Sequence, residues 1–402
     1  MLREPLFILA ILSLCVVVSE WIVRRTWLRH FGTALVVIVV TAIVANAGLI
    51  PTGTGNVPIY GVVFKEVAWM AIFCMLLQVR LREVVKAGPV MIALFGLGAA
   101  GTCLGALAGM TVVGGPARFG DAHAALAGMF TGTYTGGSAN FIAIASQYEV
   151  TDGLLLASAN AVDAAMTAVW MAATVAIPRF LPRRGAAAGG RVAPAKARDA
   201  TVSDGKKARM ARASTIDADV AEDTEGLHPI DLALVLAIAA IAVWGSDPLA
   251  SWLGAALGFE IPGILVLTTF ALLLAQAPPI ARLRGPRVLG LFGVYLFLAV
   301  IGALCDVEAL RSSGVFGLWL FVFVTVLLAV HAVFVFGAST LLRLDPDVAA
   351  VASQANIGGS TSALALARSL GRSDLVLPGI LVGSLGSAVG TYLGVAVVVL
   401  LS

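Results

Sequence analysis

Long hydrophobic runs separated by short polar connections fill most of the chain. A membrane-spanning helix needs about 20 mostly apolar residues, and the runs predict six segments in the first half, at 5–22, 31–49, 61–79, 90–112, 122–147 and 154–177. Six more are predicted in the second half, at 230–244, 261–275, 289–304, 315–335, 348–367 and 375–400. Between these sets, Arg, Lys, Asp, Glu, Ala and Gly dominate, which predicts a flexible hydrophilic linker. The predicted organisation is a transmembrane repeat over 1–178, a linker over 179–228 and a second transmembrane repeat over 229–402.

The fifth segment of each half contains the same short motif. Residues 135–140 read TGGSAN and residues 357–362 read IGGSTS, and the register between the copies continues without a gap to the pairs Asp152/Asp374 and Leu155/Leu377. A glycine pair within a membrane helix permits a local break, and the backbone groups that it frees need partners other than lipid. Two such breaks at corresponding positions are typical of a transporter site. The alternative is that these glycines only allow close helix packing.

Two further glycine stripes have the spacing of packing motifs. They are Gly101, Gly105 and Gly109 in the fourth segment, and Gly386, Gly390 and Gly394 in the last. Small residues four positions apart let helix backbones approach each other. We therefore expect these stripes to pack the central helices together.

The composition is that of a membrane protein. Of the 402 residues, 59% are hydrophobic and 12% charged, and the mean hydropathy is +0.98, whereas an average soluble domain carries about 25% charged residues. The net charge of +3 and the scattered Lys and Arg argue against nucleic-acid binding. The four cysteines form no CxxC pair, so neither a zinc site nor a disulfide framework is indicated. We expect an all-α polytopic protein in a lipid bilayer that is not an enzyme and carries no cofactor.

The loop charges conflict with the segment count. The loop after the third segment is basic, with Arg80, Arg82 and Lys86, whereas its counterpart in the second half carries Asp306 and Glu308. Because basic loops stay in the cytoplasm, this favours inverted repeats, although six spans per repeat would make the repeats parallel. Counting forward from the arginines of the first loop would also place the basic linker outside. One segment is therefore miscounted, re-entrant or interfacial, and the working range is 11 to 13 hydrophobic segments.

Three stretches carry a family resemblance. Residues 132–141 (GTYTGGSANF), 355–360 (ANIGGS), and 377–383 (LPGILVG) followed by 390–394 (GTYLG) resemble the DUF819 (YjcL-like) family. The resemblance covers essentially the whole chain apart from the linker, and that family is similar to the cation:proton antiporter and anion transporter folds. It implies a core domain with two crossing discontinuous helices and a panel domain that often dimerises, so a homodimer is expected. It also implies a multi-pass protein of a bacterial plasma or inner membrane, and it supplies no substrate.

The two breaks provide the candidate binding site. Each half-helix N-terminus exposes amide groups with a partial positive charge, and each C-terminus exposes carbonyls of the opposite sign, so the ends suit an anion and a cation respectively. The candidate substrate- or ion-binding residues are Thr131, Thr133, Thr135, Gly136, Gly137, Ser138 and Asn140 at the first break, Asn160 and Asp163 in the sixth segment, and Gln354, Asn356, Gly358, Gly359, Ser360, Thr361 and Ser362 at the second break. Any single hydroxyl could instead bond to its own helix.

Ionisable residues within the segments refine this site. Asp163 lies three residues after Asn160 on one helix face, and a central aspartate raises the cost of membrane insertion by about 2.5 to 3.5 kcal/mol. We expect Asp163 to carry a coupling proton or to help ligate a transient Na⁺; the alternative is a structural hydrogen bond to a broken-helix amide. His331 is a candidate proton relay or a hydrogen-bonding group at a helix interface. Lys65 and Glu66 predict an intrahelical or interfacial ion pair.

The leading interpretation is a secondary active transporter. It would move a small organic, anionic solute together with Na⁺ or H⁺, by alternating access at the paired breaks. A passive channel or holin-like efflux protein is the alternative, and a membrane scaffold or regulator that acts through the charged linker is the third reading.

Overall fold

The computed structural model describes residues 4–26, 32–52, 57–181, 227–305 and 315–402, and these residues form helices and short connections without a strand. All twelve predicted segments are helical in this described part. Most of the predicted linker, at 182–226, lies outside it, as do Asp306 and Glu308. Arg179, expected to begin the linker, belongs to the last turn of a helix.

The helices begin where the sequence offers a helix-starting residue. Pro5, Pro58, Pro89, Pro286 and Pro346 each occupy the first turn of a helix, where a missing N–H leaves no hydrogen bond unmade. The first half contains α1 (Pro5–Arg25), α2 (Gly32–Asn46), α3 (Pro58–Val62) that continues through the π-helical Val63–Val67 into α4 (Ala68–Leu76), α6 (Pro89–Val113), α8 (His123–Gly136), α9 (Ser138–Gln147) and α10 (Gly153–Phe180).

The second half follows the same plan. It contains α13 (Pro229–Leu257), α14 (Gly263–Ala275), α16 (Pro286–Leu304), α18 (Phe316–Ala332) that continues through the π-helical Val333–Gly337 into α19 (Ala338–Leu341), α20 (Pro346–Ser369) and α21 (Val376–Leu401). The prediction of 230–244 was too short, because α13 continues through Ser246 and Pro248 to Leu257. The polar Ser246 does not end the helix, since its hydroxyl donates to the carbonyl of Ala242 within the helix at 2.5 Å.

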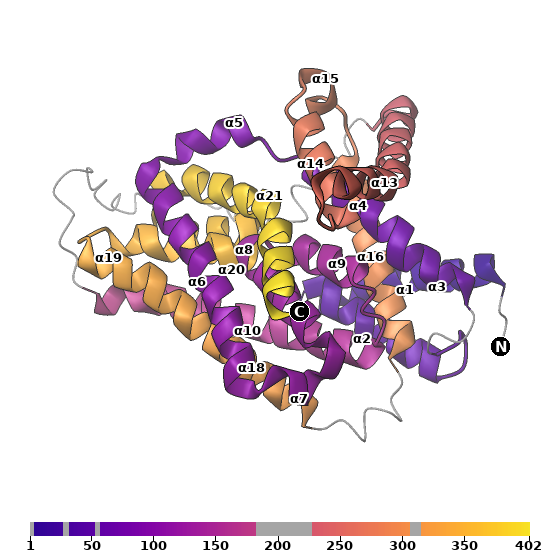
Figure 1. Ribbon diagram of the computed structural model, residues 1–402, viewed down its shortest axis with the longest axis horizontal. Helices are drawn as coiled ribbons and strands as arrows, with labels where there is room; N and C mark the ends of the chain where they lie inside the picture. The colour runs from indigo at the N-terminus through magenta and orange to yellow at the C-terminus, as the bar shows by residue number, and fades with distance from the viewer. Residues whose placement is uncertain (1–3, 27–31, 53–56, 182–226, 306–314) are drawn as a thin grey trace, which may run out of the picture.

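Eight helices of the described part are long and apolar enough to cross a membrane, and two shorter apolar ones span Thr33–Asn46 and Gly263–Ala275. All of these helices fall into two packing groups. The panel group contains α1, α2, α3, α4, α13, α14 and α16, and the core group contains α6, α8, α9, α10, α18, α20 and α21. Figure 1 shows the panel helices gathered on the right of the view and the core helices on the left. Each group therefore draws helices from both halves of the sequence.

The first glycine motif forms a helical hairpin, which we call hairpin 1 (α8 and α9). The backbone leaves the helical region at Gly137, with φ 95° and ψ 174°. Beyond it α9 folds back along α8, so that the rings of Phe130 and Phe141 lie 6.1 Å apart at 90°. A Cβ atom placed on Gly132 would lie 3.1 Å from the Cβ of Asn140. The two short helices therefore return to the end of the molecule from which they entered.

The second motif forms hairpin 2 (α20). Its backbone breaks at Gly359, with φ 71° and ψ −166°, a conformation close to that of Gly137. Without the break, a straight helix of 24 residues would span about 36 Å. Instead Arg372, just after α20, donates from Nη1 to Oδ2 of Asp345 at 2.7 Å and to Oδ2 of Asp347 at 3.1 Å, both at the start of α20. The two ends of hairpin 2 therefore meet.

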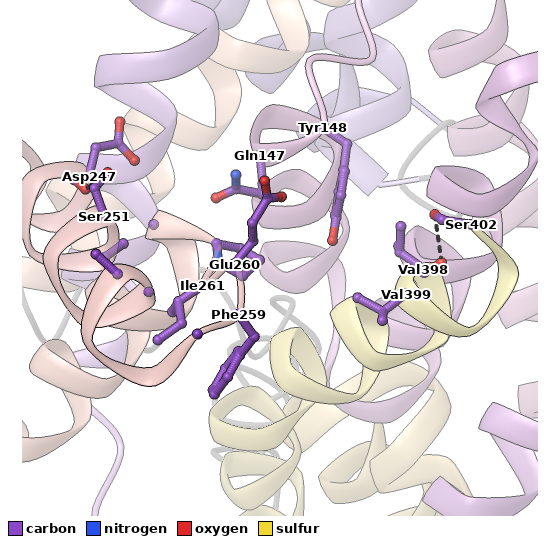
Figure 2. A pocket seen from close by; sticks show the side chains of 16 residues that line it. Gln147, Tyr148, Asp247, Ser251, Phe259, Glu260, Ile261, Val398, Val399 and Ser402 are labelled. Atoms are coloured by element: carbon purple, nitrogen blue, oxygen red, sulfur yellow. Dashed lines mark hydrogen bonds between the residues drawn. The ribbon is translucent and has the colours of Figure 1, made fainter.

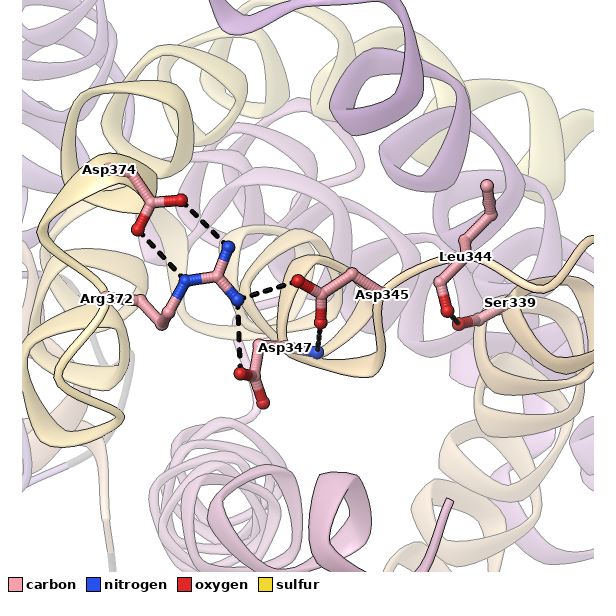
Figure 3. A network of polar contacts seen from close by, with 6 residues as sticks. All are labelled: Ser339, Leu344, Asp345, Asp347, Arg372 and Asp374. Carbon is pink, nitrogen blue, oxygen red and sulfur yellow. Dashed lines mark hydrogen bonds and ion pairs between the residues drawn. The ribbon is translucent and has the colours of Figure 1, made fainter. Parts of the chain in front are cut away.

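A cluster of charges fastens the ends of hairpin 2. Figure 3 shows the Arg372 guanidinium between Asp374 on one side and Asp345 and Asp347 on the other. The hydrogen bonds to Asp374 and Asp345 raise the pKa of Arg372 above its ordinary value. The arginine therefore stays charged at every pH at which the protein is folded, and the cluster depends on the ionisation of the carboxylates alone.

Helix α21 supports both hairpins along its length. Gly379 packs against Val351 and Ala363 of hairpin 2, whereas Gly390 packs against Gly132 and Asn140 of hairpin 1. The two tips meet beside the part of α21 between Gly379 and Gly390. A Cβ atom on Gly359 would lie 3.9 Å from the carbonyl oxygen of Gly136. This differs from the crossing discontinuous helices that the family resemblance implied. The hairpins enter from opposite ends of α21 and meet tip to tip.

The glycine stripes act as predicted. A Cβ atom on Gly386 would collide with the carbonyl oxygen of Thr135, and one on Gly105 would lie 2.6 Å from the carbonyl oxygen of Leu327. Both are contacts with main-chain atoms, which no side-chain rotation can relieve. The expectation that these stripes pack the central helices is confirmed.

The helix ends sort onto two faces, which we name after the residues at the ends of α21. At the Ser402 face, His123 at the start of hairpin 1 lies 3.3 Å from the carbonyl of Leu401, and Gln147 at its end accepts from the amide of Ile264 at 2.8 Å. At the Arg372 face, the guanidinium of Arg80 donates to the carbonyls of Ala275 and Ala281. Apart from its hairpin, each half contains five long helices or continuous helix pairs: α1, α2, α3–α4, α6 and α10 in the first, and α13, α14, α16, α18–α19 and α21 in the second.

We expect Gly386→Ala to destabilise the protein strongly, because its methyl group would collide with the main chain of Thr135 and Gly136. Overpacking of this kind costs roughly 1 to 3 kcal/mol, so the midpoint of thermal unfolding in detergent should fall by several degrees. Gly317→Ala is the control, because nothing lies within 4 Å of its new methyl group. Equal unfolding midpoints for the two variants would contradict the proposed packing.

Candidate functional site

The structure brings most of the candidate site residues to the hairpin tips. Thr133, Thr135, Gly136, Gly137, Ser138 and Asn140 surround the tip of hairpin 1, and Gln354, Asn356, Gly358, Gly359, Ser360, Thr361 and Ser362 surround that of hairpin 2. Thr131 lies deeper in α8 and donates to its own helix at the carbonyl of Ala127, at 2.8 Å. Ser138 is exposed and Thr361 is half-buried, so the tips are not sealed off from the surface.

Hydroxyl groups of α21 hold the two tips. Ser387 donates to the carbonyl of Gly136 at 3.1 Å, which caps the C-terminus of α8. On the other tip, Ser360 donates to the carbonyl of Ile380 at 3.1 Å and lies 3.3 Å from the hydroxyl of Ser384. The main-chain groups that each break frees are thus satisfied in part by α21, as buried backbone groups require.

Several polar atoms near the tips are buried and have no hydrogen-bond partner among the described residues. They are Thr135 Oγ1, Asn140 Nδ2, Gln354 Nε2 and Asn356 Oδ1. Tyr134 and Asn356 occupy the same place in the two motifs, two residues before the first glycine. Because a buried polar group without a partner costs roughly 1 to 3 kcal/mol, such a concentration of open groups is typical of a site that binds something.

Two of these amides have hydrogen-bond partners on one side, and for Asn356 the partners fix the orientation of the amide. Asn356 Nδ2 donates to the carbonyls of Phe95 and Ala352 at 3.1 and 3.2 Å, which only accept, so its oxygen is the open atom. Asn140 Oδ1 accepts from the hydroxyl of Thr391 at 2.7 Å, and its Nδ2 is open. The site therefore offers both an acceptor and a donor.

Asp163 lies on a polar face of α10. This face contains Asn160, Asp163, Thr167, Trp170 and Thr174, spaced three or four residues apart. The Asp163 carboxyl lies beside the hydroxyls of Tyr134 and Thr167, and none of the ion pairs of the described residues includes it. The structure thus places a carboxyl group without a countercharge next to hairpin 1.

His331 belongs to a fully satisfied hydrogen-bond chain. Trp170 Nε1 donates to Ser353 Oγ at 3.0 Å, Ser353 Oγ lies 2.9 Å from His331 Nε2, and His331 Nδ1 lies 2.9 Å from the carbonyl of Gly98. A carbonyl only accepts, so Nδ1–H of His331 donates to Gly98, and Nε2 bonds to the Ser353 hydroxyl. The chain joins α6, α10, α18 and α20 through His331, which favours the interface reading of His331.

Some site residues were not anticipated from the sequence. Thr102 donates to the carbonyl of Tyr134 at 3.2 Å, and Thr174 donates to Gln354 Oε1 at 3.1 Å. Thr167, Trp170 and Thr174 could have been found, because they continue the spacing of Asn160 and Asp163 along one face of α10. Thr102 offers no such signal, since its partner is a main-chain carbonyl in another segment.

Comparison with known proteins identifies the family of the chain. The family described as "Protein of unknown function (DUF819)" matches residues 7–402. The chain belongs to the DUF819 family. It is 27% identical over 381 residues to "Uncharacterized membrane protein YjcL" of Bacillus subtilis (strain 168), an alignment that covers 92% of this chain and 90% of the relative. No solved structure matches the chain. This DUF819 protein is a multi-pass protein of the cell membrane.

A groove of about 830 Å³ opens at the Ser402 face of this DUF819 protein. Figure 2 shows Gln147 and Tyr148 at the end of hairpin 1 between Asp247 and Ser251 of α13 on one side and the end of α21 on the other. Beside it, Lys65 Nζ lies 3.3 Å from Asp247 Oδ2. Of the two predicted kinds of ion pair, Lys65 therefore forms one across a helix interface, with α13, and its partner is not revealed by any local sequence pattern.

We expect His331→Leu to lower the unfolding midpoint, because it removes the buried hydrogen bonds that join His331 to Ser353 and to Gly98. The loss should be about 1 to 3 kcal/mol. Thr325→Val on the same helix is the control, since its exposed hydroxyl bonds only to the carbonyl of Phe321. Thermal unfolding of both purified DUF819 variants measures the difference, and equal midpoints would contradict the structural role.

Proposed function

We propose that this DUF819 protein is a secondary active transporter that moves a small organic, anionic solute together with Na⁺ or H⁺. The observation that carries the proposal is the meeting of two hairpin tips at which buried polar atoms lack partners. Unwound or broken backbone deep in a membrane protein is tolerated only where it is buried in protein or lines a cavity. Paired breaks in corresponding positions are the usual construction of a transporter site.

The charge of the tips supports an anionic solute. The helices that begin at Ser138 and after Gly359 point their N-termini toward the meeting point, and each such end carries roughly half a positive charge. Hydroxyls and amide N–H groups, including Asn140 Nδ2 and Gln354 Nε2, add donors without a fixed charge. A carboxylate fits these donors, and its release does not have to break a salt bridge with the protein.

Asp163 supports coupling to a cation. Its buried carboxyl lies beside the hydroxyls of Tyr134 and Thr167, and no basic side chain of the described residues pairs with it. An ionised carboxylate in such a place is costly unless a proton or a metal cation neutralises it. Binding of the cation and of the anionic solute then compensate each other's charge, which is the physical basis of the proposed coupling.

The count of crossing helices supports inverted repeats. Because each hairpin returns to its own face, each half crosses five times, and an odd number reverses the second half relative to the first. A re-entrant segment in each half would thus explain why the loop charges conflict with a count of six spans per half. The Arg372 face is rich in basic residues, among them Arg25, Arg80, Arg82, Arg282 and Arg343, whereas the Ser402 face carries Asp121, Glu149, Asp152 and Glu260 near Arg118. We propose that the Arg372 face lies in the cytoplasm.

We expect Asp163→Asn to remove the ion dependence of solute flux while solute binding persists, because the amide keeps the shape of the carboxyl but holds no cation. Flux of a panel of small carboxylates into proteoliposomes, with an imposed Na⁺ or pH gradient, measures this. Ligand at 100 times its dissociation constant adds about 2.7 kcal/mol of stability, so thermal unfolding first identifies which panel member binds. Asp121→Asn, at an exposed position, is the control.

Other outcomes would decide against the proposal. An unchanged coupling ratio in Asp163→Asn would refute the coupling role. Flux that ignores both gradients in the parent protein would favour a passive channel or a holin-like efflux protein.

Deletion of residues 186–224 distinguishes the transporter from the scaffold or regulator. The deletion lies within the hydrophilic linker, outside every helix that forms the tips or the packing groups. We expect the shortened protein to keep the solute flux of the parent, measured in the same proteoliposomes. Flux that depends on the linker, or no flux in either protein together with loss of a bound soluble partner on deletion, would support the scaffold reading.

A further inference from the structure

The two hairpins differ in how they meet the panel group. In hairpin 1, α9 packs against α4 and α14 and against the π-helical turn of Val63–Val67. Hairpin 2 packs against α6, α8, α10 and α21, all within the core group, and in the described part of the chain it has no comparable contact with α2, α4, α14 or α16. One hairpin is thus closed against the panel group and the other is not.

Three hydrogen bonds close hairpin 1. Trp69 Nε1 donates to Ser146 Oγ at 3.1 Å, and Ser146 Oγ donates to the carbonyl of Phe64 at 2.8 Å. The amide of Ile264 donates to Gln147 Oε1 at 2.8 Å. Trp69 is 1% exposed and Ser146 is 2% exposed, so this latch, which we define as Trp69, Ser146 and Phe64, is shielded from competing water.

The latch uses an irregular turn of the panel group. Phe64 lies in the π-helical stretch Val63–Val67, where the wider turn changes the main-chain hydrogen bonding and a side chain can reach a carbonyl. Single π-helical turns are frequent at functional sites. The irregular turn is therefore the feature of the panel group that receives Ser146.

The sequence register shows that hairpin 2 is open at the matching place. The register that aligns Ser138 with Ser360 also aligns Ser146 with Arg368 and Gln147 with Ser369. Arg368 and Ser369 are both exposed, whereas Ser146 is buried. Equivalent positions of a duplicated element are thus covered on one hairpin and uncovered on the other.

We propose that the two hairpins are alternating gates, and that the structure is the state in which the latch holds hairpin 1 against the panel group near the Ser402 face, while hairpin 2, near the Arg372 face, is not held against it. In the opposite state, hairpin 1 leaves the panel group, and Arg368 and Ser369 of hairpin 2 become covered by it. That the gates serve to move a solute rests on the proposed transport function. The gating itself is measurable without a solute.

The first test measures from which side of the membrane a cysteine at a hairpin tip can be modified. Thr361→Cys, placed at the half-buried tip of hairpin 2, is exposed to a membrane-impermeant maleimide in sealed vesicles of each orientation. We expect modification from the Arg372 face only. Ser251→Cys, which lines the groove at the Ser402 face, verifies the orientation, and the parent protein measures the background from its own four cysteines. Modification of Thr361→Cys mainly from the Ser402 face would overturn the assignment.

The second test removes the latch. Trp69→Phe keeps an aromatic ring but loses the N–H donor to Ser146, and loss of one hydrogen bond shifts a two-state equilibrium about fivefold. Modification of the tip cysteine from the Ser402 face should rise by about that factor, and Ser146→Ala should do the same. Trp244→Phe is the control, because Trp244 is 79% exposed.

The outcomes separate this inference from the transport function. If neither Trp69→Phe nor Ser146→Ala changes the modification pattern, the latch is refuted even in a protein that transports its solute. If the pattern shifts as expected but no solute crosses in proteoliposomes, the gate is supported and the transport function fails.

Discussion

The close approach of main chains between α21 and the two hairpins is the constraint on which the rest of the structure depends. Gly383 lies against Ser360 and Gly386 against Gly136, at distances that leave no space for a methyl group. The same helix presents Ser384 and Ser387 to the tips. Helix α21 therefore supplies both the space in which the hairpins meet and hydrogen-bonding groups that their broken backbones need.

The polar groups of the core fall into two classes with different consequences. The chain from Trp170 through Ser353 and His331 to Gly98 satisfies all of its members, so it fixes the relative positions of four helices. The groups nearer the tips, such as Thr135 and Asn356, keep open atoms. The hydrogen-bonded chain holds the helices rigid beside tips whose polar atoms lack partners. This arrangement suits a binding site, because a rigid site loses less conformational entropy when a ligand binds.

Most of the helices could be predicted because a membrane-spanning helix requires a long run of apolar residues. Such a run is a local property of the sequence and needs no knowledge of the fold. The packing role of Gly105 and Gly386 was also predictable, since the spacing of small residues is itself the signal. The direction of the chain after Gly137 and Gly359 was not. A break in a crossing helix and the tip of a hairpin have the same local sequence, and only the contacts with α21 decide between them. Lys65 pairs with Asp247 for a similar reason, because its partner is distant in sequence and near only in the folded chain.

The order of synthesis gives the position of α21 a further consequence. Hairpin 1 carries Thr131, Thr133, Tyr134 and Thr135 in a short helix, and it leaves the ribosome long before α21. Lipid offers no partner for the polar groups of an unsupported hairpin. During biogenesis both hairpins must therefore stay shielded by other protein, or at the water boundary, until α21 enters the membrane. A chain without α21 would leave both hairpins without support.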